Sequence, residues 1–170
     1  MLDLPHRIEK VVSGGQTGAD KGGLLGASDR KLPTGGWAPK GFITENGPAP
    51  DLADFGLLET ASSEYPDRTE RNVKMSDGTV IFDVAKKYSG GSALTERLCG
   101  KHTKPCFIVR QLGEVMYGDN SRDVTNILNF INLNNIRVLN VAGNRESNVR
   151  GLQEKVRAII KEVITKQNTV

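Results

Sequence analysis

Short, nearly continuous apolar runs alternate along the chain with segments in which apolar residues recur every third or fourth position. The runs predict strands that are covered on both faces, and the spaced pattern predicts amphipathic helices. Strands are expected at about 8–13, 79–84, 105–109 and 137–143, with a short one ending near Trp37. Helices are expected at about 17–30, 62–75 and 92–102, in a segment capped by Ser121, and in the C-terminal stretch with the stripe Val149, Leu152, Val156, Ile159, Ile160, Val163 and Ile164.

This alternation of strands and helices is typical of βαβ units. It predicts an α/β fold with a doubly wound, mostly parallel sheet and helices on both faces, which makes three layers. The length of 170 residues fits a single domain. The stretch 32–58 is rich in glycine and proline and predicts no long element, so we expect the loop of about 33–61 to cover a ligand.

Composition narrows the class of protein. Hydrophobic residues make up 37% and charged residues 25%, which is typical of a globular protein. The net charge is only +3 and the basic residues are scattered, so we expect no nucleic-acid binding. No apolar stretch reads as a signal peptide or a membrane span, which predicts a cytoplasmic protein without a membrane partner. Cys99 and Cys106, like His6 and His102, lack metal-ligand spacing, so we expect reduced thiols and no metal site.

Three loops that connect a predicted strand to a predicted helix have unusual compositions, namely 13–20, 89–96 and 143–147. In a parallel sheet such loops meet at one edge, where ligands bind. Glycines at a helix N-terminus let an anion approach unpaired backbone N–H groups, and an arginine fork suits a phosphate. The convergence predicts an anion-binding crevice with the candidate residues Gly14, Gly15, Gln16, Thr17, Gly18, Gly90, Gly91, Ser92, Thr95, Gly143, Asn144 and Arg145.

Two common nucleotide fingerprints do not fit these loops. A dinucleotide fingerprint needs G-x-G-x-x-G, but Ser13 stands where its first glycine belongs, and no acidic residue ends the second strand. The string G-x-x-x-x-G-K-[ST] of a P-loop does not occur. Ordinary dinucleotide-dependent oxidoreduction and P-loop hydrolysis of ATP or GTP are therefore disfavoured.

Several ordered motifs resemble one known family across about residues 8–152. They are SGGQTGAD at 13–20, GGWAPKG at 35–41, RTERNV at 68–73, SDGT at 76–79, GGSALT at 90–95 and RVLNVAGNRES at 137–147. The family is that of the putative molybdenum carrier (molybdenum-cofactor carrier) proteins, within a Rossmann-like superfamily that includes the lysine-decarboxylase-like phosphoribohydrolases. Two positions depart from the family pattern: Ala38 stands where many relatives have cysteine, and Arg71 where an aromatic residue is expected.

The resemblance implies a Rossmann-like fold in a homo-oligomer, a dimer or tetramer, whose glycine loops surround a small phosphorylated ligand. A molybdopterin-type cofactor is the favoured ligand, and a nucleotide is possible. Trp37 would stack on a pterin or purine, or else anchor its loop. Lys40 would meet a phosphate or stay solvated. Arg68 and Asn72, four residues apart on one helix face, would close one side of the crevice or belong to a solvated face with an Arg68–Glu64 pair.

A binding or carrier protein is the preferred function, and two alternatives stay open. One is a nucleotide hydrolase or phosphoribohydrolase with Glu96 or Asp20 as acid/base. Relatives that cleave N-glycosidic bonds carry P-G-G-x-G-T-x-x-E, but here one residue fewer separates Gly91 from Glu96, which turns the carboxylate by ~100° on a helix. The other alternative is a nucleotide-sensing module whose output is a partner protein.

Overall fold

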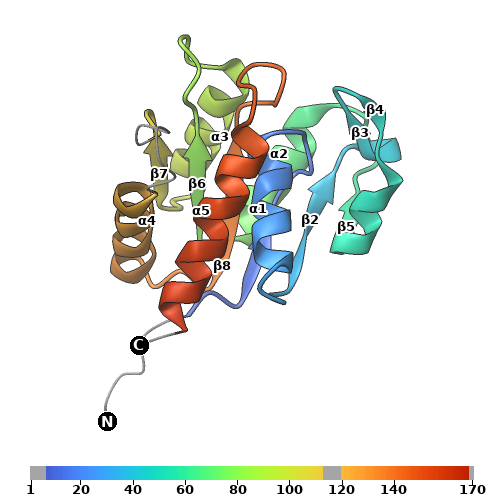
Figure 1. Cartoon of the computed structure of the whole chain (residues 1–170). Helices are drawn as coiled ribbons and strands as arrows, with labels where there is room; N and C mark the ends of the chain where they lie inside the picture. The colour runs from blue at the N-terminus through green and yellow to red at the C-terminus, as the bar shows by residue number, and fades with distance from the viewer. Residues whose placement is uncertain (1–6, 113–119, 169–170) are drawn as a thin grey trace.

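The computed structural model describes residues 7–112 and 120–168 and confirms the α/β class (Figure 1). Six parallel strands form one sheet in the order β5-β2-β1-β8-β6-β7, so the last strand in sequence lies at the centre between β1 and β6. The register places Val11 beside Leu139 and Thr79 beside Asn140. The strands are β1 Lys10–Val12, β2 Thr34–Ala38, β5 Leu57–Glu59, β6 Gly78–Phe82, β7 Cys106–Val109 and β8 Val138–Gly143.

Helices cover both faces of this sheet, as the three-layer prediction requires. One face carries α1, α4 and α5, and the other carries α2 and α3 (Figure 1). The helices are α1 Ala19–Ser28, α2 Tyr65–Met75, α3 Gly90–Lys101, α4 Ser121–Leu133 and α5 Leu152–Gln167. Among the parts of the chain that the structure describes, no helix combines the length and the apolar character that crossing a membrane requires.

The glycines of α1 explain how closely this helix packs. A Cβ at Gly22 would lie 2.5 Å from the Gln153 carbonyl oxygen at the start of α5, and one at Gly23 would lie 2.7 Å from the Val141 side chain in β8. Glycine therefore lets α1 contact both α5 and the sheet. This close contact offsets the helix-propensity cost of each glycine, roughly 0.5–1 kcal/mol relative to alanine.

The stretch 33–61 contains more structure than its composition predicts. After β2 it forms two short 3-10 helices, Lys40–Phe42 and Pro50–Phe55, and an antiparallel pair of strands, β3 Ile43–Thr44 and β4 Gly47–Pro48. It also supplies β5, which sequence reasoning missed. Three residues are too few for a pattern, and β5 exists through its ladder with β2, in which Leu57 pairs with Gly36.

The helix starts differ from the predicted ones in two places. Ser62 and Ser63 predict a serine cap for this helix, but they do not cap it: α2 begins at Tyr65, and its cap is Glu64, whose side chain makes no capping hydrogen bond. Ser121 is the first residue of α4, and Asn120 is its cap. The other predicted elements have the right type, with ends shifted by a few residues, as local patterns usually allow.

Candidate functional site

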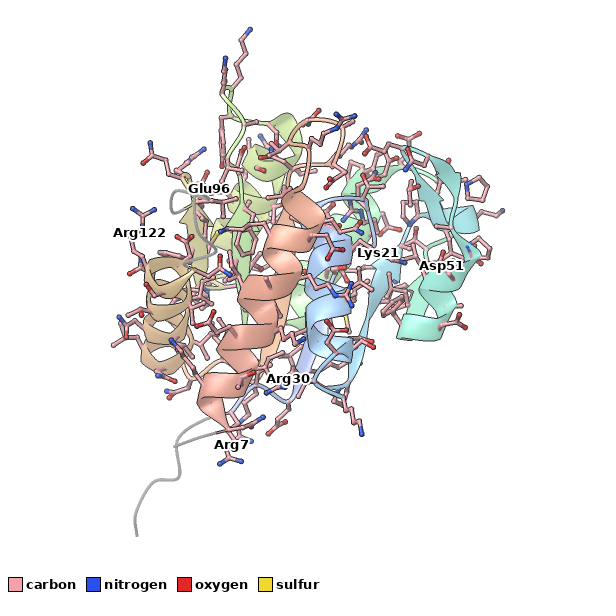
Figure 2. All side chains as sticks on the ribbon, in the orientation of Figure 1. Arg7, Lys21, Arg30, Asp51, Glu96 and Arg122 are labelled. Atoms are coloured by element: carbon pink, nitrogen blue, oxygen red, sulfur yellow. The ribbon has the colours of Figure 1, made fainter. Side chains whose placement is uncertain are left out.

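A cavity of about 440 Å³ lies at the carboxyl edge of the sheet, where the loops after β1, β6 and β8 meet the start of α2. Side chains crowd this edge in Figure 2. Of the predicted site residues, those that line the cavity are Gln16, Asp20, Arg68, Gly90, Gly91, Thr95, Gly143, Asn144 and Arg145. Its wall is completed by Tyr65, Pro66, Thr69, Ser89, Leu94, Ala142, Ser147 and Asn148.

The first glycine loop is closed on itself. Its Gly15 N–H donates to the Ser13 hydroxyl oxygen at 3.2 Å, the Gln16 N–H to an Asp20 carboxylate oxygen at 3.3 Å, and the Thr17 N–H to the Gln16 side-chain oxygen at 3.0 Å. These are three of the five backbone donors, at residues 14–18, that the sequence suggests for a phosphate. In the structure the protein's own side chains occupy them.

A buried ion pair lies beside this loop at the floor of the cavity. The Arg68 guanidinium contacts the Asp20 carboxylate at 3.1 Å, and the side chains are only 13% and 4% exposed. Asp20 thus replaces Glu64 as the expected partner of Arg68. Burial raises the pKa of Asp20 and outweighs the opposing charge of Arg68 and the backbone N–H donors of Gln16 and Gly14.

The guanidinium of Arg68 also explains Gly14. A Cβ at this position would lie 1.7 Å from a guanidinium nitrogen of Arg68, so only glycine leaves room for the pair with Asp20. The Nε atom of Arg68 is buried and donates to no acceptor within residues 7–112 and 120–168. A buried donor without an acceptor is uncommon and costly, so the Arg68 side chain is held here by its pair with Asp20 at the expense of this donor.

The second glycine loop is open. Ser89 caps α3 by accepting the Ser92 N–H at 3.1 Å, and its own N–H donates to buried Asp83 at 3.1 Å. The preceding N–H groups, those of Gly90 and Gly91, have no acceptor in the described part of the chain, and a Cβ on either residue would meet open space. The N-terminus of α3 therefore presents two backbone donors and the positive end of its dipole to the cavity.

Asn144 in the third loop ties all three loops together. Its side-chain oxygen accepts the Val84 and Ala85 N–H groups at 2.8 and 3.1 Å, and its amide nitrogen donates to Asp83 at 2.9 Å. Its backbone oxygen accepts the Ala19 N–H at 3.1 Å. Asn144 is 1% exposed, so it positions the loops and presents little of its own surface to a ligand.

Sequence reasoning missed Tyr65, which lines the cavity, and Glu45, which lies outside its wall but joins two of the loops. The ring of Tyr65, the first residue of α2, lies 5.0 Å from the Arg145 guanidinium carbon. Glu45, in the turn between β3 and β4, accepts hydrogen bonds from the hydroxyls of Thr17 and Ser147 and so joins the hairpin to the first and third loops. Burial raises the pKa of Glu45, but the hydrogen bonds from Ser147 and Thr17 outweigh it and lower the pKa overall.

Both residues stood in stretches that gave only weak signals. Tyr65 lies three positions before the RTERNV motif, inside a segment interpreted as a helix start. Glu45 lies in the irregular stretch between β2 and β5. Their partners are distant in the sequence, so no local spacing could have singled them out.

Several predicted site residues do not line the cavity. The backbone of Trp37 is held by the Asn72 side chain, which accepts the Trp37 backbone N–H at 2.8 Å and donates to the Trp37 carbonyl oxygen at 2.9 Å. The Arg71 guanidinium lies over the indole, 4.8 Å from the ring centre. Ala38 is fully buried against Leu24 and Leu52. The remaining residues outside the cavity wall are Gly14, Gly15, Thr17, Gly18, Lys40 and Ser92, and of these Lys40 is exposed.

Glu96, the first acid/base candidate, also lies outside the cavity wall. Its carboxylate accepts a hydrogen bond from the hydroxyl of Tyr88, and the Arg110 guanidinium lies over the Tyr88 ring, 3.9 Å from the ring centre. Burial, and next the hydrogen bond that Tyr88 donates to Glu96, raise the pKa of Tyr88 to about 12. Asp20 is the one of the two acidic candidates that reaches the cavity.

Among the residues that the structure describes, no cysteine or histidine lines the cavity. Cys99 and Cys106 are free thiols in the small apolar cluster beneath α3, and a hydrogen bond from Cys106 lowers the pKa of Cys99 to about 7. His102 contacts Glu70 at 2.7 Å, while His6 lies outside the described residues. No group of three or more His, Cys, Asp or Glu side chains suited to a metal occurs in the described ranges.

Comparisons with known proteins agree with this architecture. A crystal structure of a protein from Syntrophus aciditrophicus SB, named a putative molybdenum carrier protein, is 37% identical in sequence and superimposes with a TM-score of 0.81. The match covers 94% of this chain and 96% of that one. The search of curated proteins found no match. The model of the circularly permutated YpsA SLOG family matches residues 11–164, and this chain belongs to that family.

Proposed function

We propose that the protein binds a small ligand that carries a phosphate on a planar heterocycle, and that it holds this ligand in the cavity at the carboxyl edge of the sheet. One observation carries the proposal. Two unpaired backbone donors of Gly90 and Gly91, at the N-terminus of α3, line the same cavity as the guanidinium of Arg145. Backbone N–H groups at a helix N-terminus together with an arginine fork are the usual means of holding a phosphate.

The favoured ligand is a molybdopterin-type cofactor, because a protein 37% identical to this chain is named a putative molybdenum carrier. The donor set fits the organic part of such a cofactor. The cavity supplies cations and N–H donors for a phosphate, whereas none of its lining residues is a histidine or cysteine. Gly90, Gly91 and Arg145 would hold the phosphate, and the metal would have to be carried by the cofactor's own ligands. A nucleotide is the second ligand that this chemistry accepts.

Isothermal titration with molybdenum cofactor, AMP, ADP-ribose and NAD tests the proposal. We expect at least one to bind, and Arg145→Met to weaken that ligand about ten-fold or more, since hydrogen bonds to a charged group contribute about 1.5–3 kcal/mol. Arg150→Met is the matched control, because Arg150 is exposed and does not line the cavity. Binding of none of the four, or equal effects of the two variants, would contradict the proposal.

A second candidate function is hydrolysis of a nucleoside monophosphate at its N-glycosidic bond. The observation that favours it is a buried carboxyl group with a raised pKa in the cavity, Asp20, which is the usual state of a catalytic acid. Water would add across the bond to give the free base and ribose 5-phosphate. Release of base from AMP that is lost in Asp20→Asn and retained in Glu96→Gln would support it; no release by the unmodified protein would exclude AMP as a substrate.

The remaining predictions concern the protein as a whole. Homo-oligomerisation, as a dimer or tetramer, is tested by light scattering with and without AMP. A ligand-dependent change of mass without turnover would favour the nucleotide-sensing function over the carrier. Fractionation of the native cells tests the predicted cytoplasmic location.

A further inference from the structure

The aromatic surface of the cavity comes from Tyr65. It is the only aromatic residue among the described residues that line the cavity. Trp37, the aromatic side chain that the sequence suggests for stacking, does not line the wall, and its ring already carries Arg71. A planar ligand in this cavity therefore meets the ring of Tyr65.

Tyr65 is held in place from three sides. Its hydroxyl oxygen accepts a hydrogen bond from the Gln16 amide at 3.3 Å, and its backbone oxygen accepts the Thr69 hydroxyl at 2.9 Å. The guanidinium carbons of Arg145 and Arg68 lie 5.0 and 5.5 Å from its ring centre. Gln16, Arg68 and Arg145 come from three separate segments of the chain, so the ring marks the point where the walls of the cavity converge.

The two arginines at this ring differ in how firmly they are bound. Arg68 is 13% exposed, pairs with Asp20 and lies against Gly14. If its guanidinium turned toward a ligand, the buried Asp20 carboxylate would lose its ion-pair partner. Arg145 is half-buried, and among the described residues no carboxylate lies within ion-pair distance of it, although its charge contributes to lowering the pKa of Glu45. Its contact with Tyr65 is a cation–π interaction, which contributes roughly 0.5–1 kcal/mol at exposed sites, less than a charge-assisted hydrogen bond to a phosphate. Arg145 can therefore turn to a phosphate and leave the ring.

We propose that Tyr65 is the stacking residue of the cavity: the ligand's fused, planar nitrogen heterocycle lies on the Tyr65 ring while Arg145 exchanges that ring for the phosphate at the N-terminus of α3. This inference rests on the proposed function and adds the contact with the heterocycle, for which that function names no residue. Tyr65 recognises the heterocycle, and Arg145 binds the phosphate.

Titration of AMP and ribose 5-phosphate into matched variants tests the assignment. Both probes carry the phosphate, but only AMP carries the heterocycle. We expect the unmodified protein to bind AMP about ten-fold or more tighter than ribose 5-phosphate, because stacking of a base on an aromatic ring typically contributes that much. Tyr65→Leu should remove this preference without weakening the binding of ribose 5-phosphate, since Arg145 then has no ring to leave, whereas Tyr65→Phe should retain the preference.

Two further variants separate the outcomes. Tyr88→Leu is the control for loss of a tyrosine, because Tyr88 is exposed and lies outside the cavity wall. Loss of the AMP preference in Trp37→Leu but not in Tyr65→Leu would overturn the assignment. An equal loss of affinity for AMP and for ribose 5-phosphate in Tyr65→Leu would also overturn it. If the unmodified protein binds AMP no more tightly than ribose 5-phosphate, the proposal that Tyr65 stacks on the base is wrong, whereas the proposed phosphate site is still supported. If it binds neither probe, the proposed function fails for nucleotides, and the stacking assignment fails with it.

A fluorescence readout adds a test that does not depend on affinity. In a Trp37→Phe background, Tyr65→Trp places the only tryptophan of the chain at the proposed stacking position. AMP should quench its emission and ribose 5-phosphate should not. Quenching by both probes or by neither would contradict stacking at residue 65.

Discussion

The two loops with adjacent glycines look alike in sequence but differ in what their backbone donors contact. In the loop after β1, the N–H groups of Gly15, Gln16 and Thr17 donate to side chains of the loop itself and of Asp20. In the loop before α3, the N–H groups of Gly90 and Gly91 face the cavity without an acceptor in the described part of the chain. The first loop builds the floor of the cavity, and the second leaves its donors open for the proposed phosphate.

This difference shows what a glycine loop does and does not reveal. Glycine marks a place where a Cβ does not fit or where φ is positive, and a neighbouring protein group can be the reason as readily as a ligand. At Gly14 the reason is the Arg68 guanidinium, and at Gly18 it is the backbone of the third loop, since a Cβ there would lie 2.4 Å from the Asn144 carbonyl oxygen. A loop should therefore be proposed as a phosphate site only after the structure shows which of its backbone N–H groups have no acceptor within the protein.

The largest expected effect comes from the ion pair beneath the first loop. Arg68→Met would leave Asp20 buried without its partner and should lower the free energy of unfolding by about 3–5 kcal/mol at neutral pH. Urea denaturation measures this change. Arg71→Met is the matched control on the same helix: its partner Asp67 and its own side chain are 39% and 45% exposed, so the loss should stay below about 1 kcal/mol.

The double variant Asp20→Asn/Arg68→Met distinguishes the ion pair from simple packing. If the uncompensated carboxylate causes the loss, the double variant should be more stable than Arg68→Met alone. Equal stabilities would show that the first loop does not depend on the pairing of Asp20.

Gly14→Ala should give the next largest effect. The new Cβ would overlap the Arg68 guanidinium, at 1.7 Å from its nitrogen, and would push it away from Asp20. We expect a loss of about 1–3 kcal/mol in the free energy of unfolding, as for other overpacked sites. In the Arg68→Met background the same substitution should cost less, because the guanidinium is gone. Additive losses would mean that Arg68 is not the group that excludes a Cβ.

The pH dependence of stability is the third test. Burial raises the pKa of Asp20 above its usual 3.8, so the folded protein keeps this proton to a higher pH than the unfolded chain does. The contribution of Asp20 to stability is therefore largest below about 3.8 and falls as the pH rises through the folded-state pKa, with a slope of up to about 1.4 kcal/mol per pH unit. The unmodified protein should lose stability relative to Asp20→Asn as the pH rises from about 4 toward the folded-state pKa of Asp20. A constant difference would show that the pKa is not raised.

The fold was largely predictable because most of its elements have strong local patterns. The apolar runs at β6, β7 and β8 and the stripe of α5 indicated a parallel α/β sheet correctly. The short strand β5 was not predictable, since Leu57 pairs with Gly36 through the backbone alone. Sheet order depends in the same way on contacts between distant residues, and no local spacing indicated that β8 would lie between β1 and β6.

For the candidate site, the sequence predicted the edge of the sheet at which the cavity lies better than it predicted the contacts within the cavity. Three loops converge at one edge because a parallel sheet forces them to, and nine of the predicted residues line the cavity. The polar partners that distinguish the loops were not visible: Asp20 with Arg68 are 48 positions apart, and Gln16 with Tyr65 are 49 positions apart. Which donors such side chains occupy is decided by packing, and the sequence alone does not show that packing.

Gly91→Ala should have the smallest effect on stability, and its sign should be opposite to that of Gly14→Ala. Gly91 is the second residue of α3, its φ is not positive, and a Cβ there would meet no atom within 4 Å. Alanine restricts the unfolded chain and favours the helix, so we expect a gain of roughly 0.4–1 kcal/mol in thermal or urea unfolding. The same Cβ stands in the cavity wall and should weaken AMP binding. A loss of stability comparable to that of Gly14→Ala would show that the second loop is as closely packed as the first, and the contrast between the two loops would then fail.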